Sequence, residues 1–115
     1  MLYNVYEITG QYAIAPSKGE KLYAQISPLL VAGQDIELDF KGVEISATAF
    51  FNVAIGSLLE DISIEKLRHQ LKITNLNDAG QKILERVIKN SNRYYTEPSY
   101  RNAVDTVMEE YIANC

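Results

Sequence analysis

Residue types that carry chemistry are scarce in this 115-residue sequence, which has one cysteine, Cys115, and one histidine, His69. A single cysteine excludes an intrachain disulfide, which fits a reducing, cytoplasmic environment. His69 has no third group in view that would orient it as a base, so an enzyme pairing it with Ser46 or Thr48 is the least supported interpretation. We therefore expect a chain without enzymatic activity, catalytic residues, bound metal or cofactor.

An excess of positive charge is also lacking, since 11 Lys and Arg stand against 15 Asp and Glu and the net charge is −4. Binding to a phosphate backbone needs clustered Lys and Arg, so nucleic acid is not an expected partner. The glycines never fall into a phosphate-cradling spacing, which argues against nucleotide binding. No apolar run approaches the ~18 residues of a membrane span, and no export signal opens the chain. We expect a cytoplasmic protein that does not interact with membranes.

Apolar residues are nevertheless plentiful, and their spacing predicts strands and helices. Residues 2–8 and 12–15 alternate and are read as an N-terminal β-hairpin. Ser17, with Glu20 three residues later, predicts the start of a helix that ends at Gly33. Pro28 lies inside that helix and predicts a kink or an early end, because proline cannot donate a helix hydrogen bond.

The segment DIELDF, residues 35–40, alternates apolar and acidic side chains. This pattern predicts a strand with one buried and one wet face, and therefore a sheet covered by helices mainly on one side. TAFFNVAIGSLLED, residues 48–61, is apolar almost all round and predicts the most buried helix. LKITNL from Leu71 predicts another strand, and Asp78 with Gln81 predicts a capping pair that opens the next helix.

These elements predict an α/β fold with a small mixed sheet of about four to five strands and helices mainly on one face. We assign residues 1–95 to this domain and residues 96–115 to an extra C-terminal amphipathic helix. That helix carries apolar residues at spacings of three and four: Tyr100, Ala103, Val104, Val107, Met108, Tyr111 and Ile112. Such a stripe packs on its own domain or on a partner subunit, so a structural protein that forms a homodimer is an alternative function.

The loop KGVEISATAF, residues 41–50, joins the alternating strand to the buried helix. Gly42 can adopt the positive φ of a turn, and Ser46 or Thr48 is placed to cap the helix. Spacing alone favours capping. The alternative is functional, because exposed N–H groups at a helix start can meet a partner and a hydroxyl there can be modified.

Two stretches resemble a known family: residues 35–59, with Asp39-Phe40, Gly42-Val43 and Phe50, and the segment from Ile73 that contains ITNLNDAGQKILERVI. They look like the STAS-like alpha-beta domain family of unknown function, which is similar to the STAS domains of anti-sigma factor antagonists. The resemblance covers most of residues 1–95. It implies a small sheet with helices mostly on one side, and a non-enzymatic regulator that binds another protein.

In anti-sigma factor antagonists the loop before the buried helix bears a serine whose phosphorylation controls binding to an anti-sigma kinase. The resemblance therefore implies a partner such as a histidine-kinase-like ATPase or an anti-sigma factor. Ala47, Thr48 and Ala49 stand where the family has a serine-rich run, which leaves Thr48, with Ser46 just before it, as phosphoacceptor candidates. The residues expected to contact the partner are Gly42, Val43, Ser46, Thr48, Phe50 and Asn52.

Overall fold

The structure, a computed structural model, describes residues 1–113 and the side chains of residues 1–108. Cys115 and the side chains of Tyr111 and Ile112 lie outside the described residues. The elements are β1 (Leu2–Asn4), α1 (Val5–Thr9), β2 (Tyr12–Ala13), α2 (Pro16–Val31), β3 (Ile36–Asp39), β4 (Ile45–Ser46), α3 (Thr48–Ala54), the 3-10 helix η1 (Gly56–Glu60), α4 (Ile64–Gln70), β5 (Leu71–Thr74), α5 (Asp78–Thr96) and α6 (Pro98–Ala113).

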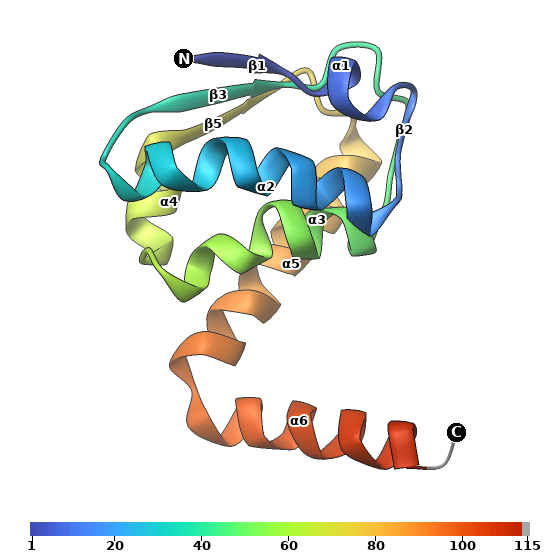
Figure 1. Cartoon of the computed structure of the whole chain (residues 1–115), viewed down its shortest axis with the longest axis vertical. Helices are drawn as coiled ribbons and strands as arrows, with labels where there is room; N and C mark the ends of the chain where they lie inside the picture. Colours follow the sequence, from blue (N-terminus) through green and yellow to red (C-terminus); the bar gives the residue numbers. More distant parts are fainter. Residues whose placement is uncertain (114–115) are drawn as a thin grey trace.

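The main sheet has three parallel strands in the order β1-β3-β5, and β2 and β4 form a separate parallel pair. The expected single mixed sheet of four to five strands is therefore wrong in size and direction. Tyr3, Leu38 and Ile73 are in register on the face that packs on the helices. Glu37 and Lys72 share the opposite face, which no helix covers (Figure 1). The prediction of helices mainly on one face is confirmed.

The prediction of an N-terminal hairpin is wrong, because the one-turn helix α1 separates β1 from β2 and the two strands join different sheets. Val5 is fully buried and Ile8 packs against the core three residues later, while Tyr6 is exposed. Over five residues this helical spacing is hard to distinguish from strand alternation. Burial of Val5 against the rest of the fold decides the conformation.

Helix α2 starts one residue before the predicted cap. Ala15 is the N-cap residue without a side-chain hydrogen bond, and Pro16 occupies the first helical position, where its missing N–H is not needed. The helix continues through Pro28 to Val31, so an early end at the proline is wrong. Its buried stripe outweighs the one lost hydrogen bond: Leu22, Ile26 and Leu30 are fully buried.

Helix α3 packs closely on α2 through Gly19, where an added Cβ would lie 2.8 Å from the carbonyl oxygen of Phe50. Phe50 and Phe51 are both fully buried, with ring centroids 5.5 Å apart. The predicted buried helix is confirmed in its burial, but it divides at Ile55 into α3 and η1.

Helix α5 packs on α3 and η1, whereas α6 lies apart from the compact part of the fold (Figure 1). The N-cap residue of α5 is Asn77, whose side chain accepts from the Gly80 N–H, so the predicted capping role of Asp78 is off by one residue. After Glu97, α6 lies across the end of the molecule opposite the sheet and contacts the end of α5 (Figure 1). Within residues 1–113 no helix is both long and apolar enough to cross a membrane.

Candidate functional site

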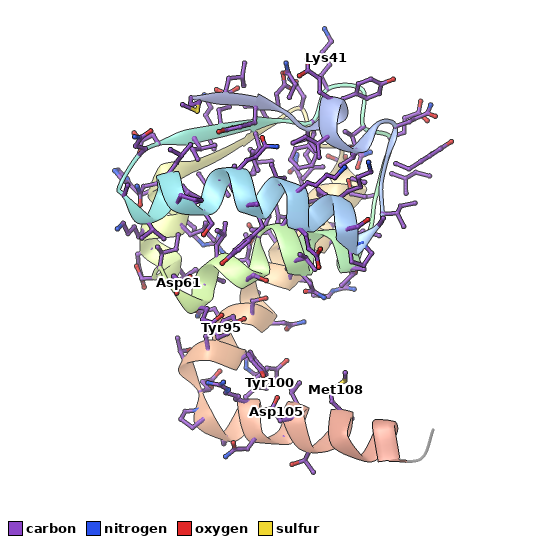
Figure 2. The ribbon with its side chains drawn as sticks, viewed as in Figure 1. Lys41, Asp61, Tyr95, Tyr100, Asp105 and Met108 are labelled. Carbon is purple, nitrogen blue, oxygen red and sulfur yellow. The ribbon has the colours of Figure 1, made fainter. Side chains whose placement is uncertain are left out.

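The candidate site is the loop between β3 and α3, and it begins with a fixed turn. Asp39 Oδ1 accepts hydrogen bonds from the Asn75 side-chain amide at 2.8 Å and from the Lys41 N–H at 2.9 Å. The Asn75 hydrogen bond, followed by that from Lys41, lowers the pKa of Asp39 below its usual value. Lys41 itself points into solvent at the tip of the turn (Figure 2).

Gly42 has a φ of +90°, which confirms the predicted left-handed turn residue. The ring of Tyr6 lies against it, since a Cβ added to Gly42 would be 2.9 Å from a Tyr6 ring carbon. Helix α1 is thereby held against the turn. Any other residue at position 42 meets both an unfavourable backbone conformation and an aromatic ring.

The second half of the loop is held by hydrogen bonds from two other elements. The Glu44 N–H donates to the Gln11 carbonyl at 2.8 Å, and the Ala47 N–H donates to the Ala13 carbonyl at 3.0 Å. The Asn77 side-chain amide donates to the Glu44 carbonyl at 2.8 Å. The loop is therefore a scaffolded surface and not a free tether between strand and helix.

The two hydroxyls of the loop have opposite environments. Ser46 is 8% exposed, because strand alternation turns it inward beside the outward-facing Ile45. Its Oγ has no hydrogen-bond partner in the described part of the chain. Thr48 is exposed at the first residue of α3. The N-cap residue is Ala47, with no side-chain cap, so the capping interpretation is wrong for both hydroxyls.

The other residues expected to contact the partner are likewise either buried or exposed. Val43 is 6% exposed and Phe50 is fully buried, so these side chains support the loop from within. Gly42 and Asn52 are exposed. Thr48 and Asn52 are four residues apart in α3 and therefore share one face of the helix. A partner approaching the loop would meet Gly42, Thr48 and Asn52.

Comparison with known families now adds to this geometry. The family model described as a STAS-like domain of unknown function (DUF4325) matches residues 18–81, which run from α2 to the start of α5 and include the whole loop. The chain belongs to this STAS-like family. The resemblance seen in the sequence is confirmed. No curated protein and no solved structure matches the chain.

The STAS-like domain also exposes apolar side chains that sequence reasoning did not select. We call Tyr6, Tyr12, Ile14 and Ile45 the β2–β4 surface. Each is about half exposed, between 46% and 51%. Tyr12 and Ile45 are opposite each other in the β2–β4 pair. The alternation in YAIA was the available signal, but it could not show that the outward face of this strand would stay uncovered.

His69 does not join the loop of the STAS-like domain. It is exposed in α4, just before β5, and shares a surface hollow with Asp35 and Glu37 at the start of β3. Ser46 and Thr48 follow the other end of β3, so the structure does not bring His69 together with either hydroxyl. Among the described residues, no group of three or more His, Cys, Asp or Glu side chains could hold a metal ion.

Proposed function

We propose that this STAS-like domain is a non-enzymatic regulatory module that binds another protein through the loop before α3, in the manner of an anti-sigma factor antagonist. The observation that carries the proposal is the position of Thr48. Its hydroxyl is exposed on a loop held by β2 and α5, and the apolar β2–β4 surface flanks that loop. An apolar surface beside a modifiable hydroxyl suits a contact that can be switched.

Phosphorylation of Thr48 is the proposed switch. A phosphate adds about 1.5–2 negative charges, and these would have to be desolvated or matched when the partner covers the neighbouring apolar residues. Docking of an acidic or apolar partner surface is then weakened. Ser46 is the poorer phosphoacceptor of the two, because a kinase would have to open the β2–β4 pair to reach its buried Oγ.

The proposed partner is a regulatory protein, either a histidine-kinase-like ATPase or an anti-sigma factor. Isothermal titration calorimetry with a purified protein of either class tests the proposal. We expect Thr48→Asp to weaken binding at least about tenfold, and Thr48→Val to bind almost as tightly as wild type. Equal affinity of Thr48→Asp and wild type would contradict the switch.

Binding by the β2–β4 surface beside the loop is tested separately from phosphorylation of Thr48. Tyr12→Ser combined with Ile45→Ser removes apolar contact area at exposed positions without opening the core. We expect this pair to weaken binding, while Lys72→Ser on the uncovered sheet face serves as the control and has no effect. Unchanged affinity of the double variant would place the interface elsewhere.

A second candidate function, a structural protein that forms a homodimer through α6, has its own support. Val107 and Met108 are 63% and 54% exposed. With Tyr100, Ala103 and Val104 they line a hollow of about 270 Å³ on α6. Analytical ultracentrifugation of the full chain and of a chain ending at Thr96 tests this function. A dimer that becomes a folded monomer on truncation supports it, and a monomer in both cases refutes it.

A further inference from the structure

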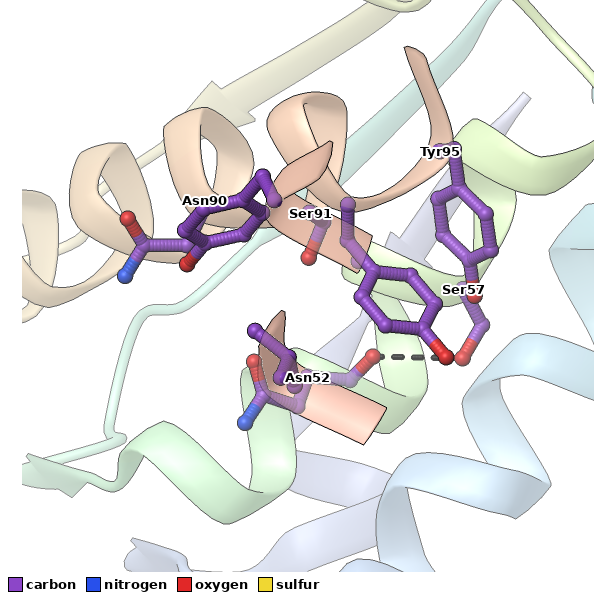
Figure 3. Close-up of a pocket in the computed structure, with 9 residues that line it drawn as sticks. Asn52, Ser57, Asn90, Ser91 and Tyr95 are labelled. Carbon is purple, nitrogen blue, oxygen red and sulfur yellow. Dashed lines mark hydrogen bonds between the residues drawn. The ribbon is translucent and has the colours of Figure 1, made fainter. Parts of the chain in front are cut away.

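A hollow of about 290 Å³ lies between the STAS-like domain and α6, and it shares Asn52 with the surface described above. It takes Asn52 from α3, Ser57 from η1, and Asn90, Ser91 and Tyr95 from α5. Figure 3 shows Asn52 and Ser57 on one side of it and the α5 residues on the other. We propose that this hollow binds a small, uncharged, polyhydroxylated ring, of the size and chemistry of a monosaccharide.

The polar lining matches the hydroxyl groups of such a ligand. Amides and hydroxyls both donate and accept hydrogen bonds, as sugar hydroxyls do. The side chains of Asn52 and Asn90 are exposed and that of Ser91 is half-buried, so all three are accessible where they border the hollow. Ser57 donates to the Asn52 carbonyl at 3.2 Å, which leaves its lone pairs available.

The aromatic lining supplies flat apolar surface for the carbon face of a ring. Tyr94, Tyr95 and Tyr100 all border the hollow, and the rings of Tyr94 and Tyr95 meet edge to face with centroids 5.1 Å apart. The Tyr94 hydroxyl donates to Asp105 at 2.7 Å, which holds that ring in place. A few oriented polar groups on an aromatic surface are typical of a small-molecule site.

Charge at the hollow favours a neutral ligand over an ion. Among the side chains of residues 1–108, no Lys, Arg, Asp or Glu lines it. The guanidinium groups of Arg93 and Arg101 lie 4.2 Å and 5.3 Å from the centroids of Tyr100 and Tyr94, so the rings already hold cations and would repel another. Arg93 pairs with Glu97 at 2.9 Å, and that carboxylate offsets the attraction of the guanidinium for an anion.

The size of the hollow limits the ligand further. Sites for small molecules usually occupy about 300–1,000 Å³. This hollow, at about 290 Å³, is just below that range and suits one substituted ring. Because Tyr100 and Val104 of α6 complete the lining, a bound ring would contact α6 and the domain at once. Binding should therefore stabilise the position of α6 against α5.

The test is titration of the full-length chain, followed in ¹H–¹⁵N NMR spectra, with the methyl glycosides of glucose, galactose and mannose, and separately with choline chloride and inorganic phosphate. We expect at least one glycoside to shift amide resonances in residues 52–57 and 90–104 and to slow hydrogen exchange in α6. Asn52→Ala and Asn90→Ala, both at exposed positions, should each weaken that binding roughly two- to tenfold, as loss of one hydrogen bond does.

Lys89→Ala is the matched control, exposed on α5 but outside the hollow, and should leave the affinity unchanged. The inference is overturned if no glycoside shifts these resonances, if choline or phosphate shifts them instead, or if the asparagine variants bind as wild type does. Asn52 also belongs to the surface proposed for the protein partner, but the titration contains no partner protein and Asn90 lies outside that surface. The outcome therefore does not depend on whether Thr48 controls a partner.

Discussion

Asn77 joins two parts of the fold that are far apart in sequence: its side-chain oxygen accepts from the Gly80 N–H, and its amide donates to the Glu44 carbonyl, both at 2.8 Å. One side chain thus caps α5 and holds the loop that precedes α3. The two bonds use different atoms of the amide, so a substitution can remove one and keep the other.

Asn77→Ala removes both bonds and should lower the free energy of unfolding by about 1–2 kcal/mol. Asn77→Asp keeps an oxygen for the cap but has no donor for Glu44, so it should retain most of the stability while amide exchange in residues 44–47 becomes faster. Urea denaturation and hydrogen exchange measure the two effects. Faster loop exchange in neither variant would show that the Asn77 bond does not hold the loop.

Gly19→Ala should destabilise the protein although alanine is the better helix former by about 1 kcal/mol. The new Cβ would lie 2.8 Å from the Phe50 carbonyl oxygen and 3.1 Å from Cβ of Val53, so α2 and α3 must move apart. We expect a net loss of about 1–3 kcal/mol by urea denaturation. Glu20→Ala, exposed at the next position, should stay within about 0.5 kcal/mol of wild type. A stabilised Gly19→Ala variant would mean that the helices do not pack this closely.

Gly42→Ala should cost more than Gly33→Ala. Both glycines have a φ of +90°, and an alanine there costs about 1–2 kcal/mol. Only Gly42 also has the Tyr6 ring within 2.9 Å, whereas nothing lies within 4 Å of a Cβ at Gly33. Thermal unfolding of both variants in the wild-type and Tyr6→Ala backgrounds measures the difference, which should vanish without the ring. Equal losses in the wild-type background would contradict the contact.

Asn75→Gly should raise the pKa of Asp39 toward its ordinary value, because the Asn75 amide is the largest cause of its lowering. Glycine keeps the positive φ of +57° without strain, so the side-chain bond alone is removed. The lowered pKa of Asp39 contributes stability that is present above the unfolded pKa and is lost as the pH falls through the folded pKa.

As the pH falls, Asn75→Gly should therefore lose less stability than the wild type, because less of its stability depends on the ionised Asp39 carboxyl. The Asp39 pKa is read from the side-chain carbonyl resonance in a pH titration. Asn90→Gly, which changes an asparagine remote from the turn, is the control and should leave the Asp39 pKa unchanged. An unchanged Asp39 pKa in Asn75→Gly would show that Lys41 alone causes the lowering.

Local patterns in the sequence determined much of the fold. The alternation of Ile36, Leu38 and Phe40 correctly predicted a strand with one buried face, and Gly42 correctly marked the turn after it. These features depend on side-chain period and on backbone sterics, which act over a few residues. The family could be recognised from the sequence for the same reason, because the residues that resemble it lie close together in one strand-turn-helix segment.

The tertiary structure decided which of the candidate site residues are accessible to a partner. Whether Ser46 or Thr48 is accessible depends on the pairing of β4 with β2. Ile45 stays exposed because no element of the described chain covers the outward face of that pair. The predicted N-terminal hairpin does not form, and α1 takes its place, because Val5 is buried by elements that are distant in the sequence. The hollow at Asn52 and Tyr95 draws on four helices, so no local pattern could predict it. Local sequence specifies the elements, whereas burial and exposure come from contacts between residues far apart in the chain.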